Sequence, residues 1–352
     1  MKPSRKKHSG PPWDGRIDRE SWRTRTGRRT RRGLPKRISS RSAGPLDVSF
    51  VDAFKANRLN TLVLGAAQLG MRYGIANVSG KPDKTRAAEI LSAAWTAGIE
   101  VIDTAQAYGD SESVIGAHLR AHPDQSFRVI TKLAAAVDHE NAGAVVASAR
   151  LSRDVLGQPL AALMLHDTTS IAKWSRGLQR GLDEILDAGI AEAVGVSIYT
   201  PAEFQAALEI PTLQVIQAPF NALDRRLLEG GLLARALESG RVLVLRSAFL
   251  QGLLLLDAGQ VPQQLSFAEP HLARWRSICA RHREGCAATA VRYVRRVAPR
   301  ALIVIGSERA EQVAANARLV AECTLSEDLV SEIEKMPIPE ERVINPSLWP
   351  PR

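Results

Sequence analysis

The feature that most constrains this chain is a regular alternation of short apolar runs with amphipathic stretches of helical length. It begins at Thr61 and indicates repeated βα units around a parallel sheet. Eight runs qualify as strands: Thr61–Ala66, Glu100–Thr104, Arg128–Lys132, Ala162–His166, Ala193–Ser197, Leu213–Gln217, Val242–Arg246 and Leu302–Ile305. A closed barrel needs eight units, whereas a doubly wound sheet usually stops at about five to seven strands. The sequence therefore predicts an α/β fold of the (β/α)8 TIM-barrel type.

The stretches between these runs show the helical period. In Thr85–Ala97 the apolar residues share one face, and Gly98 follows as a residue suited to the left-handed conformation that ends many helices. Two segments depart from the simple repeat. Residues 247–300 form a longer insert before the eighth strand, and Ser326–Lys335 predicts one more helix after it.

Positive charge is concentrated near the N-terminus. The formal net charge is +10, from 47 Lys and Arg against 37 Asp and Glu. Residues 1–60 hold 17 of these basic and 5 of these acidic residues, so this segment is +12, and the remainder, with 30 basic and 32 acidic residues, is −2. Residues 1–58 also lack apolar periodicity, which predicts a disordered basic extension. We assign residues 59–340 to the barrel and residues 341–352 to a C-terminal tail.

This charge split limits the expected partners. A barrel near neutrality lacks the basic face that duplex binding needs, so we expect no nucleic-acid partner for the barrel. For the extension, a contact with a polyanion, a solvated tail and a start codon placed too far upstream all stay open. Its paired arginines, such as Arg28–Arg29, precede no apolar segment of the kind that an export signal needs.

The lengths of the apolar runs and the spacing of the cysteines indicate the cellular compartment. The chain has no apolar run of about eighteen residues, so we expect no membrane span. Cys279, Cys286 and Cys323 form no CxxC pair and have no zinc-like histidine spacing nearby. We therefore expect no metal site, reduced thiols and a cytoplasmic protein.

Four side chains able to carry chemistry fall at the ends of three successive predicted strands. Asp103 ends the second, Tyr108 follows it in the loop, Lys132 ends the third and His166 ends the fourth. Active sites of TIM barrels lie at the carboxyl ends of the strands, so we expect these residues to converge. An ammonium favours ionisation of a phenol, whose pKa is otherwise about 10, and a carboxylate keeps a buried ammonium charged. With an imidazole to hold the carbonyl oxygen, the set predicts general-acid chemistry on a carbonyl compound.

Around these residues the chain resembles the aldo-keto reductase family. The resemblance rests on Ile102–Gly109 with Ser111, Glu112 and Gly116, on Val129–Lys132, on Leu163–His166, and on the later Gly195–Ser197, Gln217, Ser247–Gly252 and Ile305–Ser307. It covers residues 61–335. It implies a TIM-barrel oxidoreductase that reduces an aldehyde or ketone with NAD(P)H, with Asp103, Tyr108, Lys132 and His166 as catalytic residues and Tyr108 as the general acid.

The same resemblance implies how a nicotinamide dinucleotide binds without a Rossmann loop. The family positions map to Ser197 and Gln217 for the carboxamide, Phe220 for stacking on the ring, Ser247, Leu250 and Gly252 for the pyrophosphate, and Gly306, Ser307, Arg309, Gln312 and Asn316 for the adenosine end. Phe220 replaces the usual tyrosine, and Ile198 stands where many members have asparagine. NADP(H) is the family default, and NAD(H) stays open because Glu308 would repel a 2′-phosphate that Arg309 could attract.

Two other functions stay open. A cofactor-binding regulatory or redox-sensing subunit is equally compatible with the four residues. A Schiff-base aldolase or lyase would use Lys132 as nucleophile, which needs a neutral lysine that Asp103 opposes. The rim candidates for the small-molecule carbonyl substrate suit a sugar-like compound, although a plain aldehyde fits as well; they are Gln68, Met71, Tyr73, Gln106, Tyr199 and residues 246–253.

Overall fold

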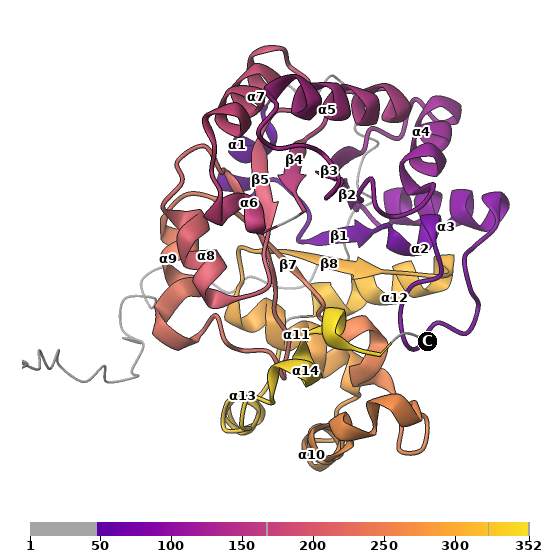
Figure 1. Ribbon diagram of the computed structural model, residues 1–352. Coiled ribbons are helices and arrows are strands. Elements are labelled where there is room, and N and C mark those ends of the chain that lie inside the picture. Colours follow the sequence, from indigo (N-terminus) through magenta and orange to yellow (C-terminus); the bar gives the residue numbers. More distant parts are fainter. Residues whose placement is uncertain (1–47, 167, 323, 351–352) are drawn as a thin grey trace, which may run out of the picture. The chain divides into compact units, whose positions relative to one another are not determined.

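The computed structural model shows eight parallel strands that close into one barrel in chain order (Figure 1). The structure describes residues 48–166, 168–322 and 324–350. The strands are β1 Leu62–Gly65, β2 Val101–Asp103, β3 Arg128–Leu133, β4 Ala162–Leu165, β5 Val194–Ser197, β6 Val215–Pro219, β7 Val242–Arg246 and β8 Leu302–Gly306. Each pairs with the next, and β1 closes the barrel by pairing with β8. The predicted (β/α)8 barrel is confirmed, and each strand overlaps the run that predicted it.

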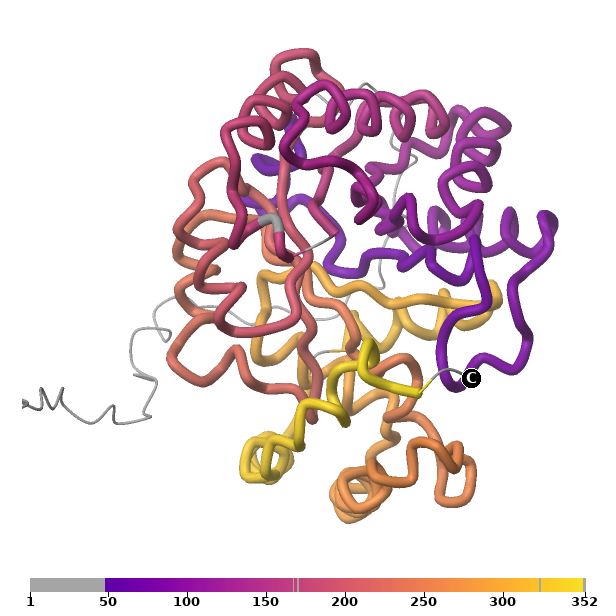
Figure 2. The backbone as a smooth tube through the Cα atoms, in the orientation of Figure 1, coloured from indigo at the N-terminus to yellow at the C-terminus, as the bar shows by residue number. Residues whose placement is uncertain are grey.

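Helices follow the strands and cover the barrel, as the tube in Figure 2 shows. The α-helices are α1 Phe50–Lys55, α2 Ala67–Gly70, α3 Lys84–Thr96, α4 Ser111–Ala121, α5 Ala142–Leu156, α6 Thr169–Ala172, α7 Arg176–Asp187, α8 Pro201–Leu208, α9 Leu232–Glu238, α10 Glu269–Arg281, α11 Cys286–Val297, α12 Ala310–Ala321, α13 Glu327–Glu334 and α14 Glu341–Ile344. Short 3₁₀ helices are η1 Glu229–Gly231, η2 Leu250–Leu255, η3 Gln263–Ala268 and η4 Pro346–Leu348. None of the helices in the described ranges has the length and apolar content that a membrane span needs.

The alternation of side chains along the strands decides which residues reach the site. Val101 of β2, Ile130 of β3 and Val244 of β7 belong to the apolar cluster inside the barrel. Successive side chains on a strand point to opposite faces, so the next inward position is two residues further on. In β2 and β3 that position is Asp103 and Lys132, at the carboxyl ends of these strands. The inward-facing positions are therefore apolar inside the barrel and polar at its rim.

The opposite end of the barrel is closed by α1. Phe50 is completely buried and packs in the interior cluster with the residues that begin the strands. Its backbone N–H donates to Glu192 at 2.6 Å, and Arg128 donates to the carbonyl oxygen of Val48 at 2.8 Å. Part of the segment that we expected to be disordered, residues 1–58, is therefore ordered, because Phe50 and Val51 are buried although their apolar patch is too short to show periodicity. Residues 1–47 lie outside the described residues.

The C-terminal segment also contains more structure than a tail. The helix expected at 326–335 is α13, which lies beside α10 and is linked to it by an ion pair between Arg281 and Glu332 (Figure 1). Beyond residue 340, where we placed the tail boundary, α14 buries Val343 and Ile344. This pair of apolar residues is too short for a periodic signal, yet it packs on the core.

Replacing Phe50 with Ala should lower the free energy of unfolding by about 3–5 kcal/mol, because it leaves a cavity at the closed end of the barrel. Urea unfolding followed by circular dichroism measures the change. Lys55→Ala is the control, since Lys55 lies on the same helix with its side chain exposed. If both variants unfolded at the wild-type midpoint, α1 would not contribute to the stability of the barrel.

Candidate functional site

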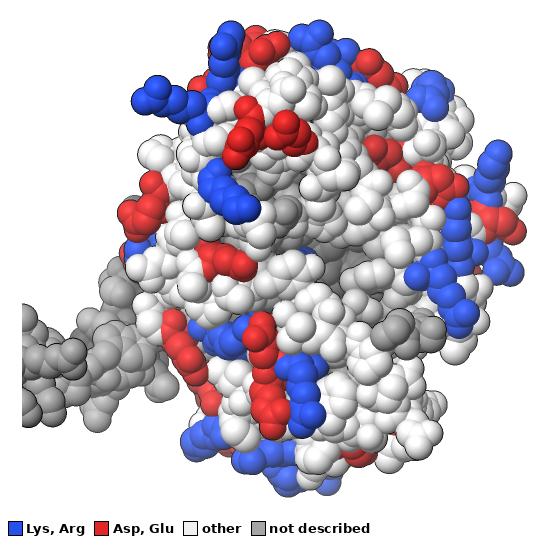
Figure 3. Space-filling model, in the orientation of Figure 1, with Lys and Arg blue, Asp and Glu red and all other residues white. Residues whose placement is uncertain are grey.

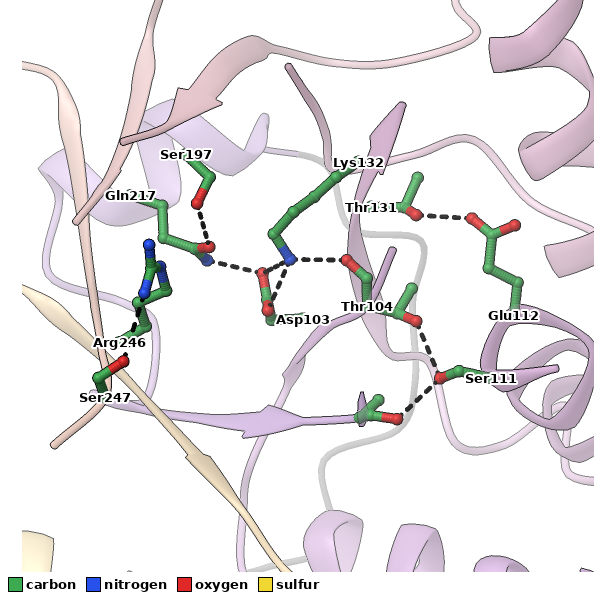
Figure 4. Close-up of polar contacts among 11 residues, drawn as sticks. Asp103, Thr104, Ser111, Glu112, Thr131, Lys132, Ser197, Gln217, Arg246 and Ser247 are labelled. Atoms are coloured by element: carbon green, nitrogen blue, oxygen red, sulfur yellow. Dashed lines mark hydrogen bonds and ion pairs between the residues drawn. The ribbon is translucent and has the colours of Figure 1, made fainter. Parts of the chain in front are cut away.

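The structure brings together Asp103, Lys132, Tyr108 and His166. The ammonium of Lys132 donates to both Asp103 carboxylate oxygens, at 2.9 and 2.8 Å, and to the carbonyl oxygen of Thr104 at 2.7 Å (Figure 4). Its Nζ lies 5.0 Å from the centre of the Tyr108 ring. The ring of His166 meets that of Tyr108 edge to face, with centroids 5.8 Å apart. The four residues that the strand ends predicted thus lie together at the carboxyl ends of the strands, and the space that they border is called the pocket below.

The loop that carries Tyr108 is held from two sides. The hydroxyl of Ser111 donates to the carbonyl oxygen of Ala66 and accepts from Thr104, which ties the start of α4 to the ends of β1 and β2 (Figure 4). On the other side, Gly70 of α2 approaches so closely that a Cβ there would lie 1.7 Å from the carbonyl oxygen of Tyr108. Only glycine permits this contact, so α2 sets the position of the loop.

Protonation in the pocket differs from our expectation. Burial lowers the pKa of Lys132, and the Asp103 carboxylate opposes that shift. We expected Lys132 to lower the pKa of Tyr108, but the pKa of Tyr108 is raised, first by burial and then by the negative charge of Asp103. Arg246 acts in the opposite direction and lowers it. Because burial and the charge of Asp103 both raise its pKa, the phenol is a protonated donor at neutral pH.

Two positions assigned to the nicotinamide carboxamide lie directly beside these residues. Gln217 of β6 donates its amide N–H to Asp103 at 2.8 Å, and the hydroxyl of Ser197 donates to the amide oxygen of Gln217 at 3.0 Å. Figure 4 shows this chain of contacts from Ser197 to Lys132. Sequence reasoning placed both residues at the rim but missed the bond to Asp103, which depends on how two strands on different sides of the barrel face each other.

Phe220 does not reach the pocket. It follows the inward-facing Gln217 by three residues, so the alternation of side chains turns it to the outside of the barrel. There it is completely buried and stacks on Tyr293 of α11, with ring centroids 6.1 Å apart. This packing leaves no open ring face for a nicotinamide, so the predicted stacking role of Phe220 does not fit the structure. Ile198, also fully buried, packs on the same outer side.

The positions assigned to the phosphates lie in the loop after β7. Ser247, Leu250 and Gly252 all have positive φ angles, of 64°, 49° and 90°. The backbone N–H groups of Leu250 and Gly252 donate within this loop, to the carbonyl oxygens of Ser247 and Phe249. Leu250 is fully buried, so the hydroxyl group of Ser247 is the polar side-chain group among the three.

The positions assigned to the adenosine end lie between β8 and α12. Asn316 donates to the hydroxyl of Ser307 at 3.2 Å, and Gln312 accepts from the backbone N–H of Glu308 at 2.7 Å. Arg309 is the residue before α12 and makes no side-chain cap, so Ser307 is not occupied as a helix cap. The first turn of a helix attracts an anion. These observations fit the adenosine phosphate of a dinucleotide at Ser307–Asn316, beyond Gly306 at the end of β8.

Among the substrate candidates, the side chain of one fastens a loop to a helix, while others lie beside Tyr108. The amide of Gln106 donates to the carbonyl oxygen of Ser148 and to the hydroxyl of Ser152, so it fastens the loop to α5. In contrast, Tyr73 and Tyr199 lie near Tyr108, and burial raises the pKa of Tyr73 to about 12. The guanidinium of Arg246 lies 4.4 Å from the centre of the Tyr199 ring. The signal for Arg246 in the sequence was a charged residue at the inward-facing end of a strand.

Comparisons with known proteins agree with this geometry. A sequence model of the Aldo/keto reductase family matches residues 61–337. An aldo-keto reductase from Bacillus subtilis (strain 168) is 26% identical over 208 residues, which is 53% of this chain and 58% of that protein. The match thus spans less than two thirds of the length of this relative.

Solved structures show a similar fold. A glycerol dehydrogenase from Gluconobacter oxydans is 21% identical, with a TM-score of 0.63, over 78% of this chain and 90% of that one. The holo form of an aldo-keto reductase from Bacillus halodurans is 19% identical, with a TM-score of 0.65, over 82% of this chain and 95% of that one. At these identities the likeness concerns the barrel and not the substrate.

Replacing Lys132 with Met should lower the free energy of unfolding by about 3–5 kcal/mol, because the Asp103 carboxylate is then buried without its partner. Urea unfolding measures this, and adding Asp103→Asn should recover part of the loss by removing the charge. Lys81→Met breaks an exposed pair with Asp110 and should cost less than about 1 kcal/mol. Equal losses for Lys132→Met and Lys81→Met would mean that the buried pair does not support the fold.

Proposed function

Because this chain belongs to the aldo-keto reductase family, we propose that it is an oxidoreductase that uses NAD(P)H to reduce an aldehyde or ketone to an alcohol, with Tyr108 as the general acid. The observation that carries the proposal is the pocket in which the Tyr108 hydroxyl group stays protonated beside Lys132 and His166. A carbonyl compound is the substrate class that needs a proton at oxygen while hydride arrives at carbon.

Each residue of the pocket has one task in this mechanism. A nicotinamide cofactor, when bound, would supply the hydride. Tyr108 gives its proton to the oxygen of the substrate as negative charge develops there, since a phenol with a raised pKa is still a stronger acid than an alcohol. Lys132, fixed by Asp103, provides positive charge below the Tyr108 ring as the phenolate forms. His166 orients the carbonyl oxygen.

The cofactor is proposed to lie across the rim, from the inside of the barrel to α12. Ser197 and Gln217 would hold the carboxamide. The hydroxyl group of Ser247 would lie along the pyrophosphate, and the start of α12 would attract the adenosine phosphate. NADP(H) is the proposed nucleotide, with NAD(H) as the alternative. Burial raises the pKa of Glu308, and the neighbouring Arg309 lowers it. The charge of this carboxyl group at the assigned 2′-phosphate position would decide between NADP(H) and NAD(H).

The substrate is proposed to be a small carbonyl compound with polar groups. Three of the four tyrosines of the chain, Tyr73, Tyr108 and Tyr199, interact in this pocket, and phenols offer hydroxylated compounds both apolar faces and hydrogen bonds. A cytoplasmic location, and a barrel without nucleic-acid or membrane partners, remain predictions.

A Schiff-base mechanism fits the geometry less well. The Lys132 ammonium has no solvent exposure and already donates to two carboxylate oxygens and one carbonyl oxygen. A nucleophilic amine would have to lose these bonds and leave Asp103 unpaired. A regulatory or redox-sensing subunit uses the same cofactor site, so turnover distinguishes it from a reductase.

Tyr108→Phe should reduce carbonyl reduction by about a hundredfold or more, because it removes the proton and keeps the ring. Single-turnover hydride transfer measures the loss, with cofactor affinity measured alongside. Tyr293→Phe is the matched control, since it removes the hydroxyl group of another buried tyrosine that packs on Phe220 outside the pocket. Near-normal hydride transfer in Tyr108→Phe would exclude Tyr108 as the acid.

The pH profile of the wild type tests the same assignment. The pKa of Tyr108 lies above its ordinary value, so the acid stays protonated throughout the neutral range, and reduction should be constant from about pH 6 to 9. Alcohol oxidation needs the phenolate as proton acceptor, so it should rise about tenfold per pH unit over this range. A loss of reduction between pH 7 and 8 would contradict a raised pKa.

Glu308→Lys should strengthen NADPH binding relative to NADH by about tenfold, since attraction replaces repulsion at the assigned 2′-phosphate position. Fluorescence titration with both nucleotides gives the ratio of dissociation constants. Glu238→Lys makes the same charge change on α9, at an exposed position away from the assigned adenosine site. An equal ratio in both variants would show that Glu308 does not face the nucleotide.

A further inference from the structure

A second cation, Arg246, shares the pocket with Lys132. It is the last residue of β7 and occupies the inward-facing position that follows Val244. Its guanidinium donates to the carbonyl oxygen of Ile198 at 3.0 Å and to the hydroxyl of Ser247 at 3.3 Å. The Tyr199 ring supports it from one face. In the view of Figure 4, Gln217 lies between Arg246 and the Asp103–Lys132 pair.

No carboxylate of the described residues forms an ion pair with this guanidinium, whereas Arg226 close by is paired with Asp224. Asp103 accepts from Lys132 and Gln217. Glu203, which follows Tyr199 on the chain, accepts from the backbone N–H groups of Tyr199 and Thr200. The carboxylates that the structure describes around Arg246 are thus committed elsewhere. Among the described residues, Lys132 and Arg246 stand against one carboxylate, Asp103.

The guanidinium also has donors to spare. It carries five N–H groups in a planar fork that matches carboxylate and phosphate oxygens, and the two hydrogen bonds above use two of them. A partly buried, oriented guanidinium without a counter-ion is a group prepared to bind an anion.

One contact of this side chain is with Ser247, which is assigned to the pyrophosphate, and the others extend away from the assigned adenosine site. The residues assigned to the phosphates follow β7 and β8. Arg246 also reaches past β6 to the carbonyl oxygen of Ile198 and the ring of Tyr199, which follow β5. This is the side of the barrel away from β8, and therefore away from the assigned adenosine site. The charge of Arg246 also lowers the pKa values of Tyr108, Tyr73 and Lys132, as expected for a cation close to the reacting group.

On the face shown in Figure 3, Lys and Arg are interspersed with Asp and Glu, although several basic side chains gather at the right edge. Interspersed charges give little net attraction beyond about 8–10 Å in physiological salt. Inside the pocket, selection of an anionic compound would depend on the guanidinium.

We propose that Arg246 is the specificity-determining residue of the carbonyl pocket and that the substrate carries an anionic group, a carboxylate or a phosphate, on the same molecule as its carbonyl. The proposal rests on the proposed reductase function. Arg246 would hold the anionic group in a forked hydrogen bond while Tyr108 and His166 face the carbonyl oxygen.

The test uses matched pairs of aldehydes with the full chain and NADPH. D-Glucuronate against D-glucose probes a carboxylate, and D-glyceraldehyde 3-phosphate against D-glyceraldehyde probes a phosphate. The quantity is the ratio of kcat/KM for the charged over the neutral member. We expect at least one pair to show a ratio of about ten or more in the wild type, and Arg246→Gln to lower that ratio about 10- to 100-fold. Arg246→Lys keeps the charge without the fork and should retain part of the preference.

Arg241→Gln is the matched control. Arg241 immediately precedes β7 at the opposite end of the barrel and also donates to backbone carbonyl oxygens, those of Leu213 and Leu208. The same loss of charge there should leave the ratio unchanged. A wild-type ratio near one for both pairs, or equal ratios in wild type and Arg246→Gln, would overturn the proposal. An unchanged ratio with a weaker NADPH affinity in Arg246→Gln would assign Arg246 to the cofactor instead.

A binding experiment separates this inference from the reductase function. Calorimetric titration of the same four compounds into the protein saturated with NADP⁺ requires no turnover. Tighter binding of a charged member by about tenfold, lost in Arg246→Gln, supports the anion site even if no carbonyl is reduced. Reduction of carbonyls without any charge preference in either experiment would support the reductase function and contradict a role of Arg246 in binding an anion.

Discussion

The buried ion pair of Lys132 and Asp103 is the interaction on which the site depends. An ammonium without solvent exposure is tolerated only where a carboxylate and further acceptors surround it, and here these are Asp103 and the carbonyl oxygen of Thr104. The need to satisfy this pair fixes the ends of β2 and β3 against each other. Gln217 extends the arrangement to β6 on another side of the barrel. Fold and site are therefore stabilised by the same contacts at the carboxyl ends of the strands.

The sequence predicted the barrel from apolar runs at regular intervals, and the residues at its rim from their places at the ends of these runs. The two-residue period of strands explains why strand ends reach the site, since Lys132 lies two positions beyond the inward-facing Ile130. The same rule shows why Phe220 fails as a stacking residue, since an odd separation from Gln217 turns it outward. Resemblance to a family aligns residues along the chain but does not report the face to which each one points.

Other features depended on distant packing and could not be predicted locally. The burial of Phe50 requires an open barrel end that residues far away in the sequence create. The raised pKa of Tyr108 results from the balance among burial, Asp103 and Arg246, and the sequence shows none of their mutual distances. A charged strand end such as Arg246 is visible in the sequence, but its lack of a carboxylate partner among the described residues is visible only in three dimensions.

The hydrogen bond from Gln217 to Asp103 makes two sites thermodynamically interdependent. A ligand that takes the amide of Gln217, as a nicotinamide carboxamide is proposed to do, competes with Asp103 for the same donor. Any such redistribution changes how strongly Asp103 stabilises the charge of Lys132. Coupling of this kind is reciprocal, so the protonation state of the pair must alter the affinity for the ligand by the same factor that the ligand alters the protonation equilibrium. Binding of the cofactor to Gln217 would thus also change the protonation equilibrium of Lys132 and Asp103.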